Sequence, residues 1–181
     1  EESISTFAAV NRTDEILITS SSGGVFGALA SKIFNDNGIV FGCAMNNQMT
    51  VEHTSIESSK DIKRLQGSKY VQSDTKLTLR EAKNVLDTGR KVLYTGTPCQ
   101  IDGLKSYLGK EYDNLLTADL ICHGVPNNQL FKDYIRWYEL EKGIKIKTYN
   151  FRDKTKEGMS TLGRIIYKKD GKSHQKTINH T

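Results

Sequence analysis

Short apolar runs of strand length alternate along the chain with segments in which apolar residues recur every three or four positions. The short runs predict strands at 15–19, 39–45, 51–56, 91–95 and 115–121. The helical spacing predicts helices between them, at 25–34, 59–65, 79–86, 98–108 and 128–138. Strands that alternate with helices are typical of an α/β fold, with a mostly parallel or mixed sheet and helices on both faces.

Glycine and polar residues mark where these elements begin and end. We expect Ser22 to cap the first long helix and Gly38 to stop it. Asn127 or Asn128 caps the last helix, and Gly143 ends it.

Beyond Gly143 the pattern becomes β-rich, with strands expected within 144–151 and 162–168 and a hairpin turn at Asp170-Gly171. We therefore divide the chain into an α/β domain, 1–143, and a β-rich C-terminal region, 144–181. The sequence opens without an initiator Met and ends without an evident stop. We therefore expect a fragment of a longer chain, truncated in its C-terminal region.

Composition narrows the class of protein. The 181 residues suit one domain, and the net charge of +5, from 26 basic and 21 acidic residues, is modest and spread out. No apolar run approaches the roughly 20 residues of a membrane span, and no signal peptide opens the chain. The lysines within 168–176 have no stacking aromatic residues between them, so no nucleic-acid binding is expected. Three cysteines, an odd number, argue against a disulfide framework and for a cytoplasmic location.

Three loops that follow predicted strands carry most of the unusual chemistry: 20–24, 96–100 and 122–126. Ligands of parallel sheets bind beyond the carboxyl ends of the strands, so these loops would crowd one edge if their strands are parallel neighbours. The first loop opens a helix whose free N–H groups favour an anion, and a plain helix cap with a glycine turn is the alternative.

Two cysteines lie in the other two loops. Cys99 falls near a helix N-terminus, where the helix dipole favours the thiolate that a metal ligand or a nucleophile must be. Cys122 ends the next strand, so the two thiols can meet in space as half of a tetrahedral sulfur site. The alternatives are a small packed cysteine, or a nucleophilic pair of Cys99 with His123 that lacks an evident orienting third group. Cys43 is interpreted as a core residue, and His53 as a surface or satisfied core group.

A polar loop, 66–73, combines a cation, a hydroxyl group and an aromatic ring around one glycine, in Gly67-Ser68-Lys69-Tyr70. That mixture suits a phosphate and a stacked ring, and a plain surface loop is the alternative.

Four motifs occur in a fixed order: Ser-Ser-Gly-Gly at 21–24, Gly-Ser-Lys-Tyr-Val-Gln-Ser at 67–73, Thr-Gly-Thr-Pro-Cys-Gln at 95–100 and Cys-His-Gly-Val-Pro at 122–126. In combination they resemble the coenzyme F420 hydrogenase/dehydrogenase beta-subunit family, and its bacterial subfamily in particular. The resemblance runs from about Phe7 to Phe151.

The resemblance implies an iron–sulfur flavoprotein that holds FAD and a 4Fe–4S cluster in the region 1–143. Cys99 and Cys122 would be two cluster ligands, and the remaining ligands would lie outside this fragment. The loops would cradle the flavin and its diphosphate through Ser21, Ser22, Gly23, Gly24, Gly67, Ser68, Lys69, Tyr70, Gln72, Thr95, Gly96, Thr97 and Pro98. No residue is assigned a catalytic role.

The implied function is that of an oxidoreductase subunit that moves electrons between the cluster and FAD, toward an organic acceptor such as a deazaflavin coenzyme. Its expected partners are a ferredoxin-type domain or partner subunit and a small-molecule electron acceptor, and it could form an oligomer. Two alternatives stay open: a non-catalytic partner-docking module with vestigial cofactor pockets, and a thiol enzyme that uses Cys99.

Overall fold

A four-stranded mixed sheet forms the centre of the protein. The computed structural model describes residues 5–154 and 162–179. The strands β1 (Ile39–Met45), β2 (Val51–Ile56), β3 (Val92–Gly96) and β4 (Leu115–Asp119) lie in the order β2-β1-β3-β4. Strands β1, β3 and β4 are parallel, and β2 pairs antiparallel with β1 at one edge. The predicted α/β fold with a mostly parallel, mixed sheet is confirmed.

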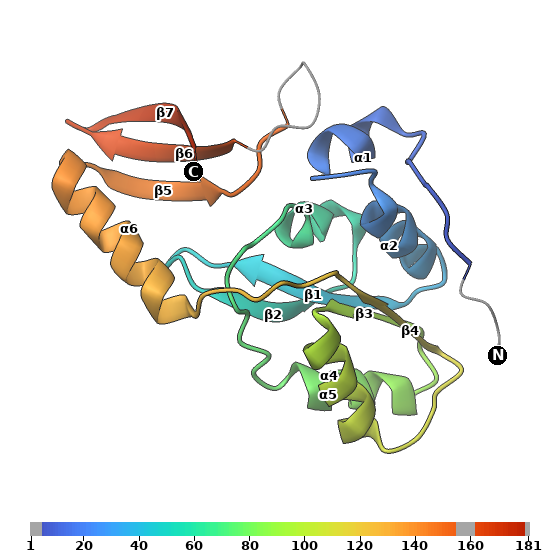
Figure 1. Ribbon diagram of the computed structural model, residues 1–181. Coiled ribbons are helices and arrows are strands. Elements are labelled where there is room, and N and C mark those ends of the chain that lie inside the picture. The colour runs from blue at the N-terminus through green and yellow to red at the C-terminus, as the bar shows by residue number, and fades with distance from the viewer. Residues whose placement is uncertain (1–4, 155–161, 180–181) are drawn as a thin grey trace.

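Helices cover both faces of this sheet (Figure 1). On one face, Phe41 and Tyr94 pack in an apolar cluster with residues of α4 (Thr78–Asp87) and α5 (Pro98–Leu108). On the other face, Val40 and Leu93 pack with residues of α2 (Val25–Asn35) and of a short helical segment, η1 (Ser59–Asp61) and α3 (Ile62–Leu65). Consecutive strand residues point to opposite faces, which is why a run such as 39–41 is apolar throughout.

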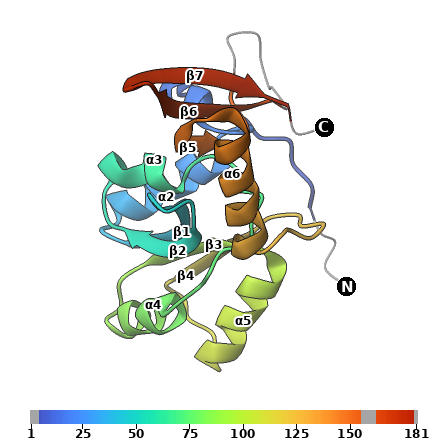
Figure 2. The same ribbon diagram turned by 90° about the vertical axis from the view of Figure 1, so that its left-hand side faces the viewer.

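A second, antiparallel sheet of three strands lies beside the first (Figure 2). It contains β5 (Lys145–Asn150), β6 (Gly163–Lys169) and β7 (Lys172–Ile178) in sequence order. The turn between β6 and β7 has φ of 50° at Asp170 and 75° at Gly171, so both central residues adopt the left-handed conformation that a two-residue hairpin requires. The predicted hairpin turn is confirmed.

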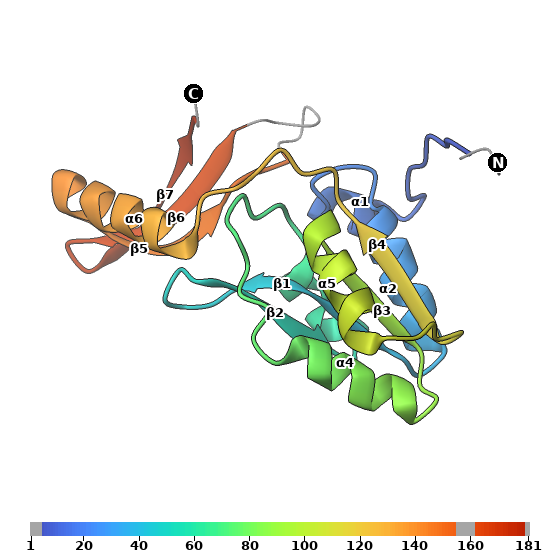
Figure 3. The same ribbon diagram turned by 60° about the horizontal axis from the view of Figure 1, so that its bottom comes forward.

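Helix α6 (Asn128–Lys142) packs against this second sheet and shares an apolar cluster with its strands. It lies at the end of the molecule away from α4 and α5 (Figure 3). The side chain of Asn127 caps it by accepting a hydrogen bond from the backbone N–H of Leu130 at 2.8 Å. Gly143 ends it in the left-handed conformation, with φ of 61°. The same apolar cluster includes Val51 of β2, so the domain boundary at 143 stays a prediction.

One predicted strand is wrong. Residues 15–19 belong to a short helix, α1 (Asp14–Thr19), which begins with two acidic residues that suit a helix N-terminus. Its Ile16 lies against Gly27 of α2, where a built Cβ atom would be only 2.4 Å from the Ile16 Cγ2. The loop 20–24 therefore follows a helix, and the sheet-edge argument does not apply to it.

Three expected helix ends also differ in detail. Helix α2 begins after Gly24, at φ of 79°, and not after Ser22. It ends before Gly38, because Asn37 takes the left-handed conformation first, at φ of 55°. Ser58, one residue before the expected position, caps the helical turn that precedes α3. In the described residues no helix is long and apolar enough to cross a membrane.

Truncation of a sheet-facing side chain of α5 tests this packing. Leu104 is fully buried, so Leu104→Ala should lower the free energy of unfolding by about 2–5 kcal/mol in urea denaturation. Leu140 of α6 is 76% exposed, so Leu140→Ala should change it by about 0.5 kcal/mol or less. Equal losses for the two variants would contradict the assigned core.

Candidate functional site

The segment 66–74, which has no helix or strand of its own, joins the three loops that the sequence singles out. The backbone N–H of Ser68 donates to the hydroxyl oxygen of Ser21 at 2.8 Å. The backbone N–H of Gln72 donates to the carbonyl oxygen of Pro126 at 2.8 Å. The Gln100 side-chain amide donates to the hydroxyl oxygen of Ser73 at 2.9 Å. The structure thus brings residues of all four motifs together through this one segment.

A buried hydrogen-bond network surrounds Ser73. The Nδ1 atom of His53 lies 2.9 Å from the Ser73 hydroxyl oxygen, and its Nε2 lies 2.9 Å from the carbonyl oxygen of Thr95. A carbonyl can only accept, so Nε2 carries the proton and Nδ1 accepts from Ser73. The other end of the network is the Gln100 carbonyl oxygen, which accepts from the backbone N–H of Thr97 at 3.0 Å. His53 is therefore a satisfied core group, one of the two outcomes expected for it.

Burial lowers the pKa of His53, and the hydrogen bond to Thr95 only partly opposes this effect. The ring also stacks on Tyr94, with 5.4 Å between centroids. Both observations agree with a neutral imidazole that serves the fold, because both of its nitrogen atoms already have partners.

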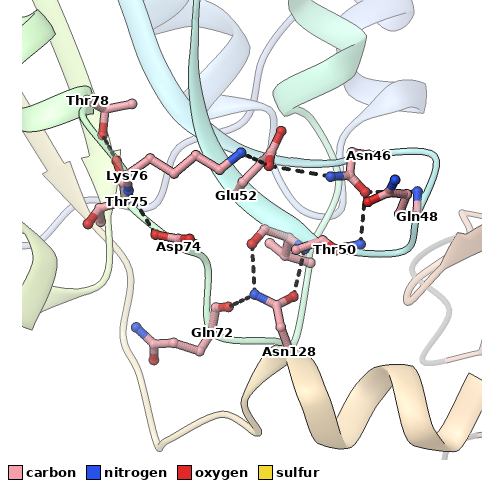
Figure 4. Close-up of polar contacts among 11 residues, drawn as sticks. Asn46, Gln48, Thr50, Glu52, Gln72, Asp74, Thr75, Lys76, Thr78 and Asn128 are labelled. Carbon is pink, nitrogen blue, oxygen red and sulfur yellow. Dashed lines mark hydrogen bonds and ion pairs between the residues drawn. The ribbon is translucent and has the colours of Figure 1, made fainter.

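Asn128 holds the far end of the segment (Figure 4). Its side-chain oxygen accepts from the backbone N–H of Val51 at 2.8 Å, and its amide nitrogen donates to the carbonyl oxygens of Val51 and Gln72 at 3.0 and 2.9 Å. Asp74 then pairs with β2, since the backbone N–H of His53 donates to its carbonyl oxygen at 2.8 Å. Sequence reasoning considered Asn128 only as a helix cap and missed this role. The signal in the sequence was a second asparagine directly after the capping residue.

The motif 21–24 packs mainly against its own chain. A Cβ atom built on Gly23 would lie 2.5 Å from the carbonyl oxygen of Ala9, so this glycine allows the close approach of two backbone segments. The ammonium of Lys154 donates to the carbonyl oxygens of Leu17 and Ser22, at 2.8 and 3.0 Å. These contacts of the loop stabilise the fold, whether or not the loop also binds a ligand.

Lys69 caps the end of α3. Its ammonium donates to the carbonyl oxygens of Gln66, Leu65 and Arg64, at 2.7, 3.0 and 3.4 Å. Burial lowers the pKa of this ammonium. The predicted contact of Lys69 with a phosphate stays a prediction, and it would have to share an ammonium that already has these three acceptors. The next residue, Tyr70, is 46% exposed and meets Phe151 edge-on, with ring centroids 5.7 Å apart.

The motif 95–98 lies at the carboxyl end of β3. The carbonyl oxygen of Gly96 accepts a hydrogen bond from the backbone N–H of Leu120 at 3.0 Å, which joins the ends of β3 and β4. Pro98 begins α5, as predicted. A Cβ atom built on Gly96 would lie 3.0 Å from the Gln100 side-chain oxygen, so this glycine makes room for the buried network.

Cys99 and Cys122 follow the ends of two adjacent parallel strands, and both thiols are free and exposed. The sulfur of Cys99 lies 3.1 Å from the hydroxyl oxygen of Thr97, and the sulfur of Cys122 accepts from the backbone N–H of Gly124 at 3.4 Å. Cys43 is half-buried in β1 and packs against an apolar cluster, as expected. In residues 5–154 and 162–179, no three His, Cys, Asp or Glu side chains are grouped to hold a metal ion. The described residues thus bring two free thiols to this edge of the sheet without a group of three metal-ligating side chains.

The fold is thus an α/β fold with a mixed sheet, and two exposed thiols follow the ends of two neighbouring strands. Residues 89–180, about half of the chain, match the family described as the C terminus of the beta subunit of coenzyme F420 hydrogenase/dehydrogenase. The chain belongs to this family, which confirms the resemblance found in the motifs.

Two relatives match most of the chain, including much of the part before residue 89. The chain is 27% identical over 164 residues to a component of the F(420)H(2) dehydrogenase of Methanosarcina mazei, an alignment that covers 88% of this chain and 44% of that protein. In the solved F420-reducing NiFe hydrogenase complex from Methanosarcina barkeri, one chain matches with a TM-score of 0.56 and 20% identity, over 93% of this chain and 58% of that chain. This likeness shows a shared fold. The chain spans about half the length of these two relatives.

Removal of the Ser73 hydroxyl tests the buried network. Ser73→Ala leaves the buried Nδ1 of His53 without a partner and leaves the Gln100 amide nitrogen with only the Ser73 carbonyl oxygen at 3.2 Å, so the free energy of unfolding should fall by about 1–3 kcal/mol. Ser106→Ala, at an exposed position of α5, should change it by about 0.5 kcal/mol or less. A Ser73→Ala variant as stable as the parent would contradict the network.

The lowered pKa of His53 predicts a pH dependence. In the unfolded chain His53 takes up a proton near its ordinary pKa of about 6.5, whereas the folded protein keeps it neutral to lower pH. The free energy of unfolding should therefore be highest above pH 6.5 and should fall as the pH drops below it. His53→Gln should remove this component, so the two stability curves should be parallel between pH 7 and 8 and converge below 6.5. Curves that stay parallel throughout would contradict the assignment.

Proposed function

We propose that this chain is the cofactor-binding part of an oxidoreductase subunit that moves electrons between a 4Fe–4S cluster and FAD, toward an organic acceptor such as a deazaflavin coenzyme. The observation that carries the proposal is the position of Cys99 and Cys122 beyond adjacent parallel strands, in a member of this family. The names of the two relatives, a dehydrogenase component and a hydrogenase complex that involve coenzyme F420, support the same class of chemistry.

The two thiols suit half of a cluster site. Cys99 lies in the first turn of α5 with its thiol exposed, so the sulfur is accessible to a cluster. Cys122 comes three residues after the last residue of β4, and the hydrogen bond between Leu120 and Gly96 ties its approach to the end of β3. The remaining ligands would come from another part of the protein or from a ferredoxin-type partner.

The flavin-binding residues are proposed in the four motifs, with the loop 67–70 as the most accessible part. A Cβ atom built on Gly67 meets nothing within 4 Å, so its backbone is open to a ligand, in contrast to the packed Gly23. Tyr70 offers an exposed ring beside it. A bound flavin accepts a hydride or two single electrons, and the chain contributes binding and orientation. The buried network around Ser73 would hold this loop and the Cys99 turn in fixed relation.

The thiol-enzyme alternative receives little support. The base considered for Cys99 is His123, which is exposed in the loop after β4 and forms no hydrogen bond with Cys99 among the described residues. In the part of the chain that the structure describes, the hydrogen-bond partner of the Cys99 thiol is the hydroxyl of Thr97, which is not a base at neutral pH.

A specific observation does favour the docking alternative. Helix α6 buries Phe131 and Ile135 but exposes four large apolar side chains at helical spacing: Leu130, Tyr134, Trp137 and Leu140. A helix with apolar residues on its outer face is typical of a surface that binds another protein. The second candidate function is therefore a partner-docking module, which differs from the first in binding a partner without cofactors.

Cofactor content separates these candidates. The complete protein, purified without oxygen, should contain iron, sulfide and flavin. Cys99→Ala and Cys122→Ala should each lower the iron content by roughly tenfold or more, since each removes a ligand atom. Cys43→Ala, which removes the half-buried third thiol, is the matched control and should keep its iron.

Three results would count against the first candidate. Iron that is unchanged in both variants would reject the two ligands. A parent protein without iron would reject the cluster, and denatured protein without flavin fluorescence would reject the flavoprotein assignment. If cofactors are absent while a partner protein still binds, the docking module is the better description.

A further inference from the structure

The outer face of α6 is an apolar surface at one end of the molecule, and no other described helix or strand covers it (Figure 1). Its four large apolar side chains are between 39% and 76% exposed: Leu130, Tyr134, Trp137 and Leu140. The first three follow one another at spacings of four and three residues, so they form one stripe along the helix, and Leu140 extends it by a turn. A stripe with this spacing is the pattern that packs against a second helix.

A groove continues this face beyond the end of α6. It has a volume of about 520 Å³ and lies between the last turns of α6, the start of β5 and the turn that joins β6 to β7. Leu140 belongs to both surfaces, and Ile144 adds a second apolar side chain to the lining. We call this space the α6 groove. The outer face and the α6 groove therefore form one continuous surface, long enough to seat a helix that lies along α6.

The charges of the α6 groove are unbalanced. Its lining contains four basic residues and two acidic ones: Arg136, Lys145, Lys168, Lys169, Glu139 and Asp170. The carboxylate of Glu139 already pairs with the ammonium of Lys145 at 2.7 Å. The side chains of the other three cations are exposed and form no ion pair or hydrogen bond with any residue that the structure describes. A partner with carboxylates at this end of the surface would supply the missing counter-charges.

These charges decide between the possible occupants. A second copy of this chain, joined face to face by two-fold symmetry, would bring the same surplus of cations to the interface. Helices that lie on a membrane carry Lys and Arg on their polar side, whereas the exposed carboxylates of Asp133 and Glu141 stand beside the apolar stripe of α6 and would be repelled by anionic lipids. A partner protein with acidic residues at one end matches the surface better than either.

We propose that the outer face and the α6 groove bind an amphipathic helix of a partner protein. Its apolar side packs on Leu130, Tyr134 and Trp137, and the acidic residues of its first turn enter the groove. Acidic residues in a first turn also complement the dipole of their own helix. Tryptophan, tyrosine and arginine, which this surface presents together, are the residue types that dominate the binding energy of protein interfaces. The inference deepens the docking alternative by naming its occupant, so it rests on that alternative and requires neither a flavin nor a cluster.

Fluorescence anisotropy of two dye-labelled synthetic peptides, titrated with the complete protein, tests the proposal. Both peptides are amphipathic helices with leucine at every third or fourth position; one has glutamates in its first turn and the other has lysines there. The glutamate peptide should bind about tenfold tighter than the lysine peptide, because only its carboxylates match the free cations of the groove.

Two variants with matched controls locate the binding. Trp137→Ala should weaken binding of the glutamate peptide about tenfold or more, whereas Tyr107→Ala, at an exposed position of α5, should change it less than about twofold. Lys168→Gln/Lys169→Gln should weaken the glutamate peptide about tenfold and should not weaken the lysine peptide. Its control, Lys60→Gln/Lys105→Gln, removes the same charge from exposed positions outside this surface and should have less than about a twofold effect.

Equal effects of a variant and its control would show only general adhesion or charge attraction and would overturn the proposal, as would a parent protein that binds neither peptide. Sedimentation of the protein alone, and with vesicles of anionic lipid, tests the other occupants. Self-association or vesicle binding that Trp137→Ala abolishes would assign the face to a second copy or to a membrane, and would also overturn it.

Flavin and iron are measured in the same samples, so that the two proposals can fail separately. Protein that binds the glutamate peptide through this surface but lacks both cofactors supports the docking site and contradicts the electron-transfer function. Protein that holds flavin and iron but binds neither peptide overturns the docking site alone.

Discussion

The hydrogen bonds around Ser73 hold segment 66–74 in place beside the central sheet. Segment 66–74 forms no regular structure, so its backbone is held by contacts with other elements. Ser73 is buried between His53 of β2 and Gln100 of α5, and it satisfies a polar atom of each. A buried polar network tolerates few alternative arrangements, because any shift leaves a donor or an acceptor unpaired. Ser21, Gln100 and Pro126, which form hydrogen bonds with this segment, therefore keep fixed positions relative to it.

The position of the two thiols depends on a simpler constraint, the parallel pairing of β3 with β4. Parallel neighbours end at the same edge of a sheet, so residues that follow them share that edge whatever their separation in sequence. Cys99 and Cys122 are 23 positions apart, and the helix α5 between them returns the chain to the sheet. The buried network and the strand pairing meet at Gly96, whose carbonyl oxygen contacts Leu120 and whose missing side chain leaves room for Gln100.

The sequence predicted the elements well where their apolar pattern is long, and the tertiary contacts poorly. Strands such as 39–45 and helices such as 98–108 have enough residues to distinguish the two spacings, whereas the run 15–19 is too short, and its helix is favoured by Ile16 packing on Gly27. The thiols and the four motifs were visible as local patterns. The contacts of Asn128 with Val51 and Gln72 and the capping of α3 by Lys69 both join residues through the fold, so no local pattern could reveal them.

The two ends of segment 66–74 serve different purposes, and Val71 separates them. Residues 66–69 line a pocket that residues of β5 also border, while residues 72–74 are bound to Asn128, Gln100 and β2. Val71 between them is 4% exposed and packs in the apolar cluster of the C-terminal sheet, which anchors the middle of the segment. Val71 and the buried network therefore hold residues 71–74, next to the Cys99 turn, through contacts that do not involve residues 66–69.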